Sequence, residues 1–208
     1  MGLAAILIAL PLLVTAPSGC RGPIAATFNI MVSHGPVDVE ADLSLAEILD
    51  LASHAGQHGK HVPVGFYTAG LGYTVQADIS GHDEAHCSGA VQVKITFGLT
   101  NRHVQIAKEW ANDPCRYAVA RAHYLRHAAA DDIVVSQFAR TLEMALREAL
   151  LPSLTGSVEE DQQRVEQAVT VVVESGFESL EHARADARDA VDTPDEVRKL
   201  SEACSSAT

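Results

Sequence analysis

Two histidines four residues apart are the side chains in this sequence best suited to chemistry. His123 and His127 lie well inside a segment that begins at Asp113-Pro114 and has the pattern of a long helix. In a helix this spacing puts both imidazoles on one face, about one turn apart, where they can bind one metal ion. The pair therefore predicts a zinc site.

A carboxylate one turn further along the same face is the nearest candidate for a third ligand. This residue is Asp131. Because the group at i+8 lies about 12 Å from the group at i, Asp131 can ligate the metal only if the helix bends or ends near Ala130. Otherwise Asp131 orients His127 without touching the metal. The predicted metal site is thus His123, His127 and Asp131, with both roles of Asp131 open.

The residue after the first histidine decides what the metal could do. In zinc peptidases this position holds a glutamate that deprotonates the metal-bound water. Here it is Tyr124, and a phenol with an ordinary pKa of about 10 is a poor base at neutral pH. The sequence therefore predicts a metal site for which no catalytic residue can be named.

Two other histidine pairs have the same spacing but lie in segments rich in glycine or charge. They are His54/His58 and His82/His86. We interpret both segments as surface turns. The second pair could instead supply a third metal ligand to His123 and His127.

The first residues have the pattern of an export signal. Residues 3–14 are almost purely apolar and are followed by small residues. This run is too short for a bilayer, which needs about 20 residues, but it suits a signal peptide over residues 1–19. Lipidation at Cys20 is the alternative way of processing this leader. No second long apolar stretch exists, and a net charge of -12 argues against a nucleic-acid partner.

Export makes the four cysteines candidates for disulfides. Cys20, Cys87, Cys115 and Cys204 allow three connectivities, and none forms a Cys-x-x-Cys motif. Cys87 opens a strand-like segment and Cys115 opens the long helix. We favour this pair, which leaves Cys20 for Cys204.

The patterns predict an α+β fold in a single domain over residues 20–208. Residues 20–112 should hold mainly strands and loops, and residues 113–208 should be helical. The predicted elements are a helix over 43–55, a strand-like region over 62–79 that turns near Gly70, a strand over 89–97, a turn at 100–102, a returning strand over 103–107, and helices over 114–150, 157–190 and from Thr193-Pro194 onward. A small antiparallel sheet is therefore followed by a long helix and two further helices.

The order of these features resembles a family of exported bacterial zinc metallopeptidases of unknown function, which are zincin-like. The matching elements are Cys87, the alternating strand after it, the second strand, Cys115, His123, His127 and Asp131, with Asp192-Thr193-Pro194 and Cys204 near the C-terminus. The resemblance covers somewhat over half of the chain. It implies zinc bound by the histidines, Asp131 as third ligand or support, a Cys87–Cys115 disulfide, and a periplasmic or extracellular location.

Tyr124 stands where the family has a glutamate, which puts catalysis in doubt. Three hypotheses for the function remain. The first is an exported zinc-binding, metallopeptidase-like protein without activity, with a peptide or a cell-envelope protein as partner. The second is a metal-free structural or binding module of the cell envelope. The third is an active peptidase that uses Asp131, Glu84 or Tyr124 as its acid or base.

Overall fold

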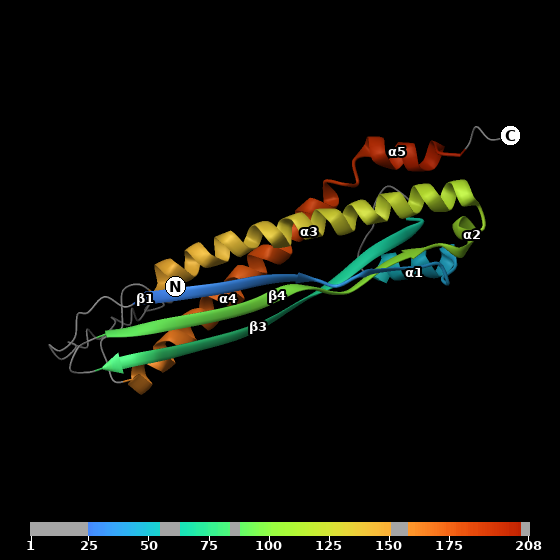
Figure 1. Ribbon diagram of the computed structural model, residues 1–208. Helices are drawn as coiled ribbons and strands as arrows, with labels where there is room; N and C mark the ends of the chain where they lie inside the picture. Colours follow the sequence, from blue (N-terminus) through green and yellow to red (C-terminus); the bar gives the residue numbers. More distant parts are fainter. Residues whose placement is uncertain (1–24, 55–62, 84–87, 151–157, 205–208) are drawn as a thin grey trace, which may run out of the picture.

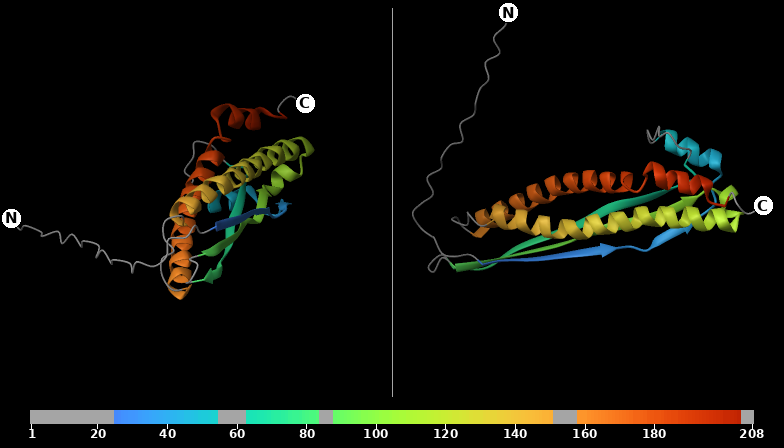
Figure 2. Two further views of the ribbon diagram at one scale, coloured as in Figure 1. Left: turned by 60° about the vertical axis from the view of Figure 1, so that its left-hand side comes forward. Right: turned by 90° about the horizontal axis from the view of Figure 1, so that it is seen from above.

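Two long helices cover one face of a twisted four-stranded sheet (Figure 1). The computed structural model describes residues 25–54, 63–83, 88–150 and 158–204. Seen from above, the two helices run side by side along the length of the sheet (Figure 2). This arrangement confirms the predicted α+β class. The predicted leader over 1–19 and Cys20 lie outside the described residues.

The longest strands set the frame of the sheet. β4 (Ser88–Ile106) is central, and β3 (Gly65–Asp83) pairs with it in antiparallel fashion along one edge. β1 (Ala25–His34) and β2 (Val37–Glu40) pair with successive stretches of β4 in parallel fashion. The sheet is therefore mixed, and the predicted all-antiparallel sheet is wrong for two of its three pairings.

The structure has no chain reversal at the predicted turn over 100–102. β4 continues through it, with Asn101 in the left-handed region at φ 49°. The facing strand shifts register between Thr68 and Gly70, so the irregularity is a bulge in a long strand pair. The hairpin of residues 89–97 and 103–107 is thus wrong. Polar, turn-favouring residues mark a bulge as readily as a turn.

The three helices predicted after residue 113 begin at or within one residue of their predicted starts, the helix predicted over 43–55 begins two residues late, and a short helix before residue 113 was not predicted. α1 is Leu45–His54 and α2 is a short turn at Lys108–Ala111. α3 is Pro114–Leu150, and Asp113 caps it by accepting hydrogen bonds from the backbone N–H groups of Cys115 and Arg116. α4 is Val158–Asp189 and α5 is Pro194–Glu202. In the described part of the chain, no helix has the length and apolar character that spanning a membrane requires.

Between the sheet and the helices lie two apolar clusters with a charged layer between them. One cluster joins the odd-numbered residues 91–99 of β4 to α3 and α4, and the other joins Val104 and Ile106 to the first half of α3. Arg102 and Asp131 lie between the clusters, and both are almost completely buried. The first half of α3, which carries the histidine pair, therefore packs on its own part of the core.

Candidate metal centre

The helix α3 brings the two histidines together. His123 and His127 are both buried, and their Nε2 atoms lie 3.2 Å apart. The rings face each other edge to face, with centroids 4.9 Å apart. Each ring therefore turns the same nitrogen toward a common point, as the spacing predicted.

The third group at this point comes from a different part of the chain. Asp192 lies in the short link between α4 and α5, and its Oδ1 atom is 3.1 Å from the Nε2 atoms of both His123 and His127. Within the described ranges, these three residues are the one set of three or more histidine, cysteine or acidic side chains close enough to share a metal ion. The site thus joins α3 to the end of α4.

The three atoms fit the dimensions of a zinc site. Zinc lies about 2.0–2.2 Å from imidazole nitrogen and carboxylate oxygen. Three atoms separated by 3.1–3.2 Å share a point about 2 Å from each, roughly 1 Å out of their plane. The fourth tetrahedral position would remain open. The Asp192 side chain is 51% exposed, so the site reaches solvent at this carboxylate, whereas both histidines are buried.

The pKa of Asp192 also reflects its two partners. Partial burial would raise this pKa, but hydrogen bonds from His123 and His127 and the charge of the imidazoles lower it well below its usual range. Asp192 is therefore an ionised carboxylate at neutral pH. That is the form in which aspartate binds a metal.

A metal-free arrangement of the same atoms competes with this one. The guanidinium of Arg126 lies 3.3 Å from His123 Nδ1. If Arg126 donates a hydrogen bond there, the proton of neutral His123 must be on Nε2, from which it can be donated to Asp192. A metal on Nε2 requires the proton on Nδ1 instead. Arg126 would then keep its ion pair with Glu196 but lose the hydrogen bond to His123.

Asp131 does not join the histidines. Its carboxylate is fully buried, and Oδ2 accepts a hydrogen bond of 2.8 Å from the guanidinium of Arg184 on α4. α3 continues to Leu150 without ending near Ala130, so Asp131 stays about 12 Å along the helix from His123. The predicted direct ligation by Asp131 is therefore wrong in this structure. Its recorded partner is Arg184, whereas the carboxylate beside both histidines is that of Asp192.

Tyr124 is a buried packing residue beside the site. Only 6% of it is exposed, and its ring lies so close to Gly65 on β3 that an added Cβ there would come within 2.6 Å of it. Burial, and the charge of Asp192, raise the pKa of Tyr124 far above its ordinary value. The phenol is therefore neutral at physiological pH and unsuited to act as a base.

A pocket of about 320 Å³ adjoins His123 between α3 and α5. Among the described residues that line it, Glu196 supplies the one carboxylate, which accepts hydrogen bonds from Arg126 and, at 2.8 Å, from Lys199. The bond from Lys199 is the largest influence on the pKa of Glu196, which is lowered. This carboxylate is thus ionised and engaged, so it too is poorly placed to accept a proton.

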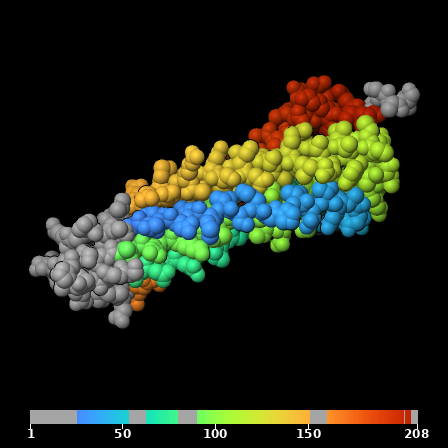
Figure 3. All heavy atoms as spheres, in the orientation of Figure 1, coloured from blue at the N-terminus to red at the C-terminus, as the bar shows by residue number. Residues whose placement is uncertain are grey.

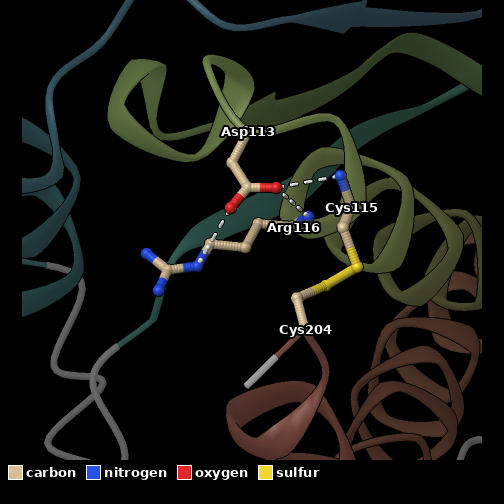
Figure 4. The surroundings of a disulfide bond; sticks show 4 residues. All are labelled: Asp113, Cys115, Arg116 and Cys204. Atoms are coloured by element: carbon tan, nitrogen blue, oxygen red, sulfur yellow. Dashed lines mark hydrogen bonds and ion pairs between the residues drawn. A yellow bond between two sulfur atoms is a disulfide. The ribbon is translucent and has the colours of Figure 1, made fainter. Parts of the chain in front are cut away.

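The disulfide near the site differs from the predicted pairing. Cys115, at the start of α3, is bonded to Cys204, just after α5 (Figure 4). The predicted Cys87–Cys115 and Cys20–Cys204 pairings are therefore wrong, since each needs a sulfur already used. The reason is that α5 continues from the end of α4 toward the start of α3, which brings the C-terminal cysteine to Cys115 (Figure 1).

Several sequence candidates cannot be placed. Glu84, Cys87 and His86, like Cys20 and His58, fall outside the described residues. The backbones of His54 and His82 belong to α1 and β3, but their side chains are not described either. Their proposed roles stay predictions.

Comparison with known proteins adds no assignment. No protein-family model, curated protein sequence or solved structure matches this chain. Sequence reasoning noted Asp192-Thr193-Pro194 only as part of a resemblance and gave Asp192 no role. The available signal was an aspartate directly before a helix cap, close in sequence to Cys204.

Proposed function

We propose that this protein binds one zinc ion through His123, His127 and Asp192. The observation that carries the proposal is the convergence of three ligand atoms, at 3.1–3.2 Å, from two segments 65 residues apart. Two neutral imidazoles and a carboxylate form a donor set that zinc accepts readily. The zincin-like arrangement of the histidines on α3 supports the same reading.

We propose further that the site does not hydrolyse peptides. A bound zinc ion would polarise a carbonyl or a water molecule at its open position. Peptidase chemistry also needs a base within reach of that water. Among the described residues around the site, none is a free base: Tyr124 is neutral, Asp131 is paired with Arg184, and Glu196 is paired with Arg126 and Lys199. Zinc would therefore act chiefly as a link between α3 and the α4–α5 segment.

An exported location fits this proposal. A disulfide between Cys115 and Cys204 is typical of proteins that fold in an oxidising compartment. The apolar run over residues 3–14 has the pattern of a signal peptide. We propose a periplasmic or extracellular protein whose partner is a peptide or an envelope protein.

Metal analysis tests the zinc site. Oxidised protein purified without an affinity tag, incubated with zinc and desalted, should hold about one zinc per chain. His123→Ala and Asp192→Ala should each remove it. The matched controls are His182→Ala and Asp186→Ala, because both residues are exposed on α4 and lie outside the cluster.

Two outcomes would overturn the proposal. One is a chain that takes up no zinc, which would favour the metal-free envelope module with Arg126 holding the proton of His123 on Nε2. The other is zinc content that survives both ligand substitutions, which would place the metal elsewhere.

A further inference from the structure

We propose that the Cys115–Cys204 disulfide regulates the zinc site, so that zinc binding and disulfide formation favour each other. The proposal rests on the proposed zinc binding by His123, His127 and Asp192. It concerns the C-terminal helix α5, which connects the metal ligand Asp192 to Cys204.

The Cys115–Cys204 disulfide and a zinc ion bound by His123, His127 and Asp192 would together close a ring between α3 and α5. Along α3, Cys115 and His123 are eight residues apart, which is about 12 Å of helix. Asp192 and Cys204 flank α5, whose nine residues are about 13 Å long. The two lengths match, so α5 lies along the first turns of α3 with the disulfide at one end and the candidate metal at the other.

Other contacts between α5 and α3 are weak. The ion pair between Arg126 and Glu196 joins side chains that are 50% and 27% exposed, and an exposed pair of this kind contributes little. Leu200 is only partly buried against the core. In the space-filling view, α5 forms a raised block on the surface of α3 (Figure 3). The disulfide is the covalent link between α5 and α3 in the described residues, and bound zinc would add a second cross-link at Asp192.

Coupling follows from this geometry. With the disulfide closed, α5 is held on α3, and Asp192 is held near the histidines before any metal arrives. With the disulfide open, zinc binding must also order this end of the chain. Thermodynamic linkage requires the converse, that bound zinc makes the disulfide harder to reduce by the same factor.

The redox step needs an external reductant. A water-soluble phosphine serves, because it takes up the oxygen of one water molecule as phosphine oxide, while the disulfide accepts two electrons and two protons to become two thiols. Phosphines also avoid the metal-binding thiols of dithiol reductants.

The test compares zinc affinity in three forms of the full chain, by competition with a chromophoric chelator. We expect the Cys115→Ala/Cys204→Ala double variant to bind zinc about tenfold more weakly than the oxidised protein, within the usual range of coupling between sites. Phosphine should weaken binding by the oxidised protein to a similar extent. The same phosphine should not change the double variant, which controls for effects at other cysteines.

A second measurement needs no substitution. The reduction potential of the Cys115–Cys204 disulfide should fall by about 30 mV in saturating zinc, which is tenfold for a two-electron couple. Equal zinc affinity in the oxidised protein and the double variant, together with an unchanged potential, would overturn the coupling and leave the zinc site standing. Failure of the oxidised protein to bind zinc would instead overturn the proposed function.

Discussion

At the scale of single residues, Asp192 has the largest consequence. Its carboxylate touches both histidines although it lies 65 residues beyond His127. The side chain is half exposed, and it is held as an anion by hydrogen bonds rather than by burial. A change at this residue therefore alters the site while leaving the core intact.

Acid should reveal this role of Asp192 in the metal-free protein. The pKa of Asp192 is lowered in the folded state. The ionised carboxylate therefore stabilises the fold fully above its unfolded pKa of about 3.9. This stabilisation is lost as the pH falls toward the lower pKa of the folded state. We expect Asp192→Asn to reduce the loss of stability between about pH 4 and pH 2. Urea unfolding at a series of pH values measures this, with Asp186→Asn as the control. An identical acid slope in wild type and Asp192→Asn would contradict the prediction.

Tyr124 allows a test of the missing base. We expect Tyr124→Glu to gain zinc-dependent hydrolysis of a casein-type substrate, because it returns a carboxylate to the position beside His123. Tyr124→Gln is the matched control, with the same length and no charge, and should stay inactive. Measurable, chelator-sensitive hydrolysis by the unmodified protein would refute the claim that Tyr124 disables the site. A folded, zinc-loaded Tyr124→Glu protein without activity would mean that more than the base is missing.

At the scale of elements, a buried ion pair links α3 and α4 beside their shared apolar cluster. Asp131 and Arg184 have 0% and 1% of their surfaces exposed, and Arg184 also donates hydrogen bonds to Glu181 and to the carbonyl oxygen of Ala69 on β3. The pair lies one helical turn beyond His127 on α3, and Asp192 follows Arg184 on the same segment as α4 ends. This ion pair therefore helps to hold α4 where Asp192 can reach the histidines.

Removing one member of this pair should be costly. Asp131→Asn removes the buried counterion of Arg184 and leaves this guanidinium with the half-exposed carboxylate of Glu181. We expect a loss of about 3–5 kcal/mol in the free energy of unfolding. The double variant Asp131→Leu/Arg184→Met should recover much of this loss, since no charge remains buried. Urea unfolding of both proteins checks it. A loss below about 1 kcal/mol in Asp131→Asn, the scale of an exposed pair, would contradict the assignment of a buried ion pair.

For the whole molecule, zinc should act as a stabilising ligand of the native fold. The ligands come from α3 and from the link after α4, so they converge only when the two helices are packed. At a free zinc concentration about 100 times the Kd, we expect stabilisation of about 2.7 kcal/mol. Thermal unfolding with and without zinc measures this, and His123→Ala should abolish the shift. A zinc-induced shift that persists in His123→Ala would point to a different binding site.

Local sequence signals determined the longer helices and two of the three residues of the site. Asp113-Pro114 and Thr193-Pro194 start α3 and α5 as predicted, because capping and proline preferences act within a few residues. The histidine pair followed from helix periodicity in the same way. These features need no knowledge of the rest of the chain.

Only the tertiary structure decided which distant groups meet. In the structure, Asp192 and not Asp131 lies beside the histidines, and Cys204 and not Cys87 is bonded to Cys115. One long bulged strand stands where the sequence predicted a chain reversal near Asn101. These choices depend on how α4 and α5 pack against α3 and on how β2 and β3 pair with β4. Such contacts depend on complementary surfaces far apart in sequence, which the local patterns of this chain do not encode. The histidine pair could thus be predicted from the sequence, whereas the third residue of the site depended on the fold.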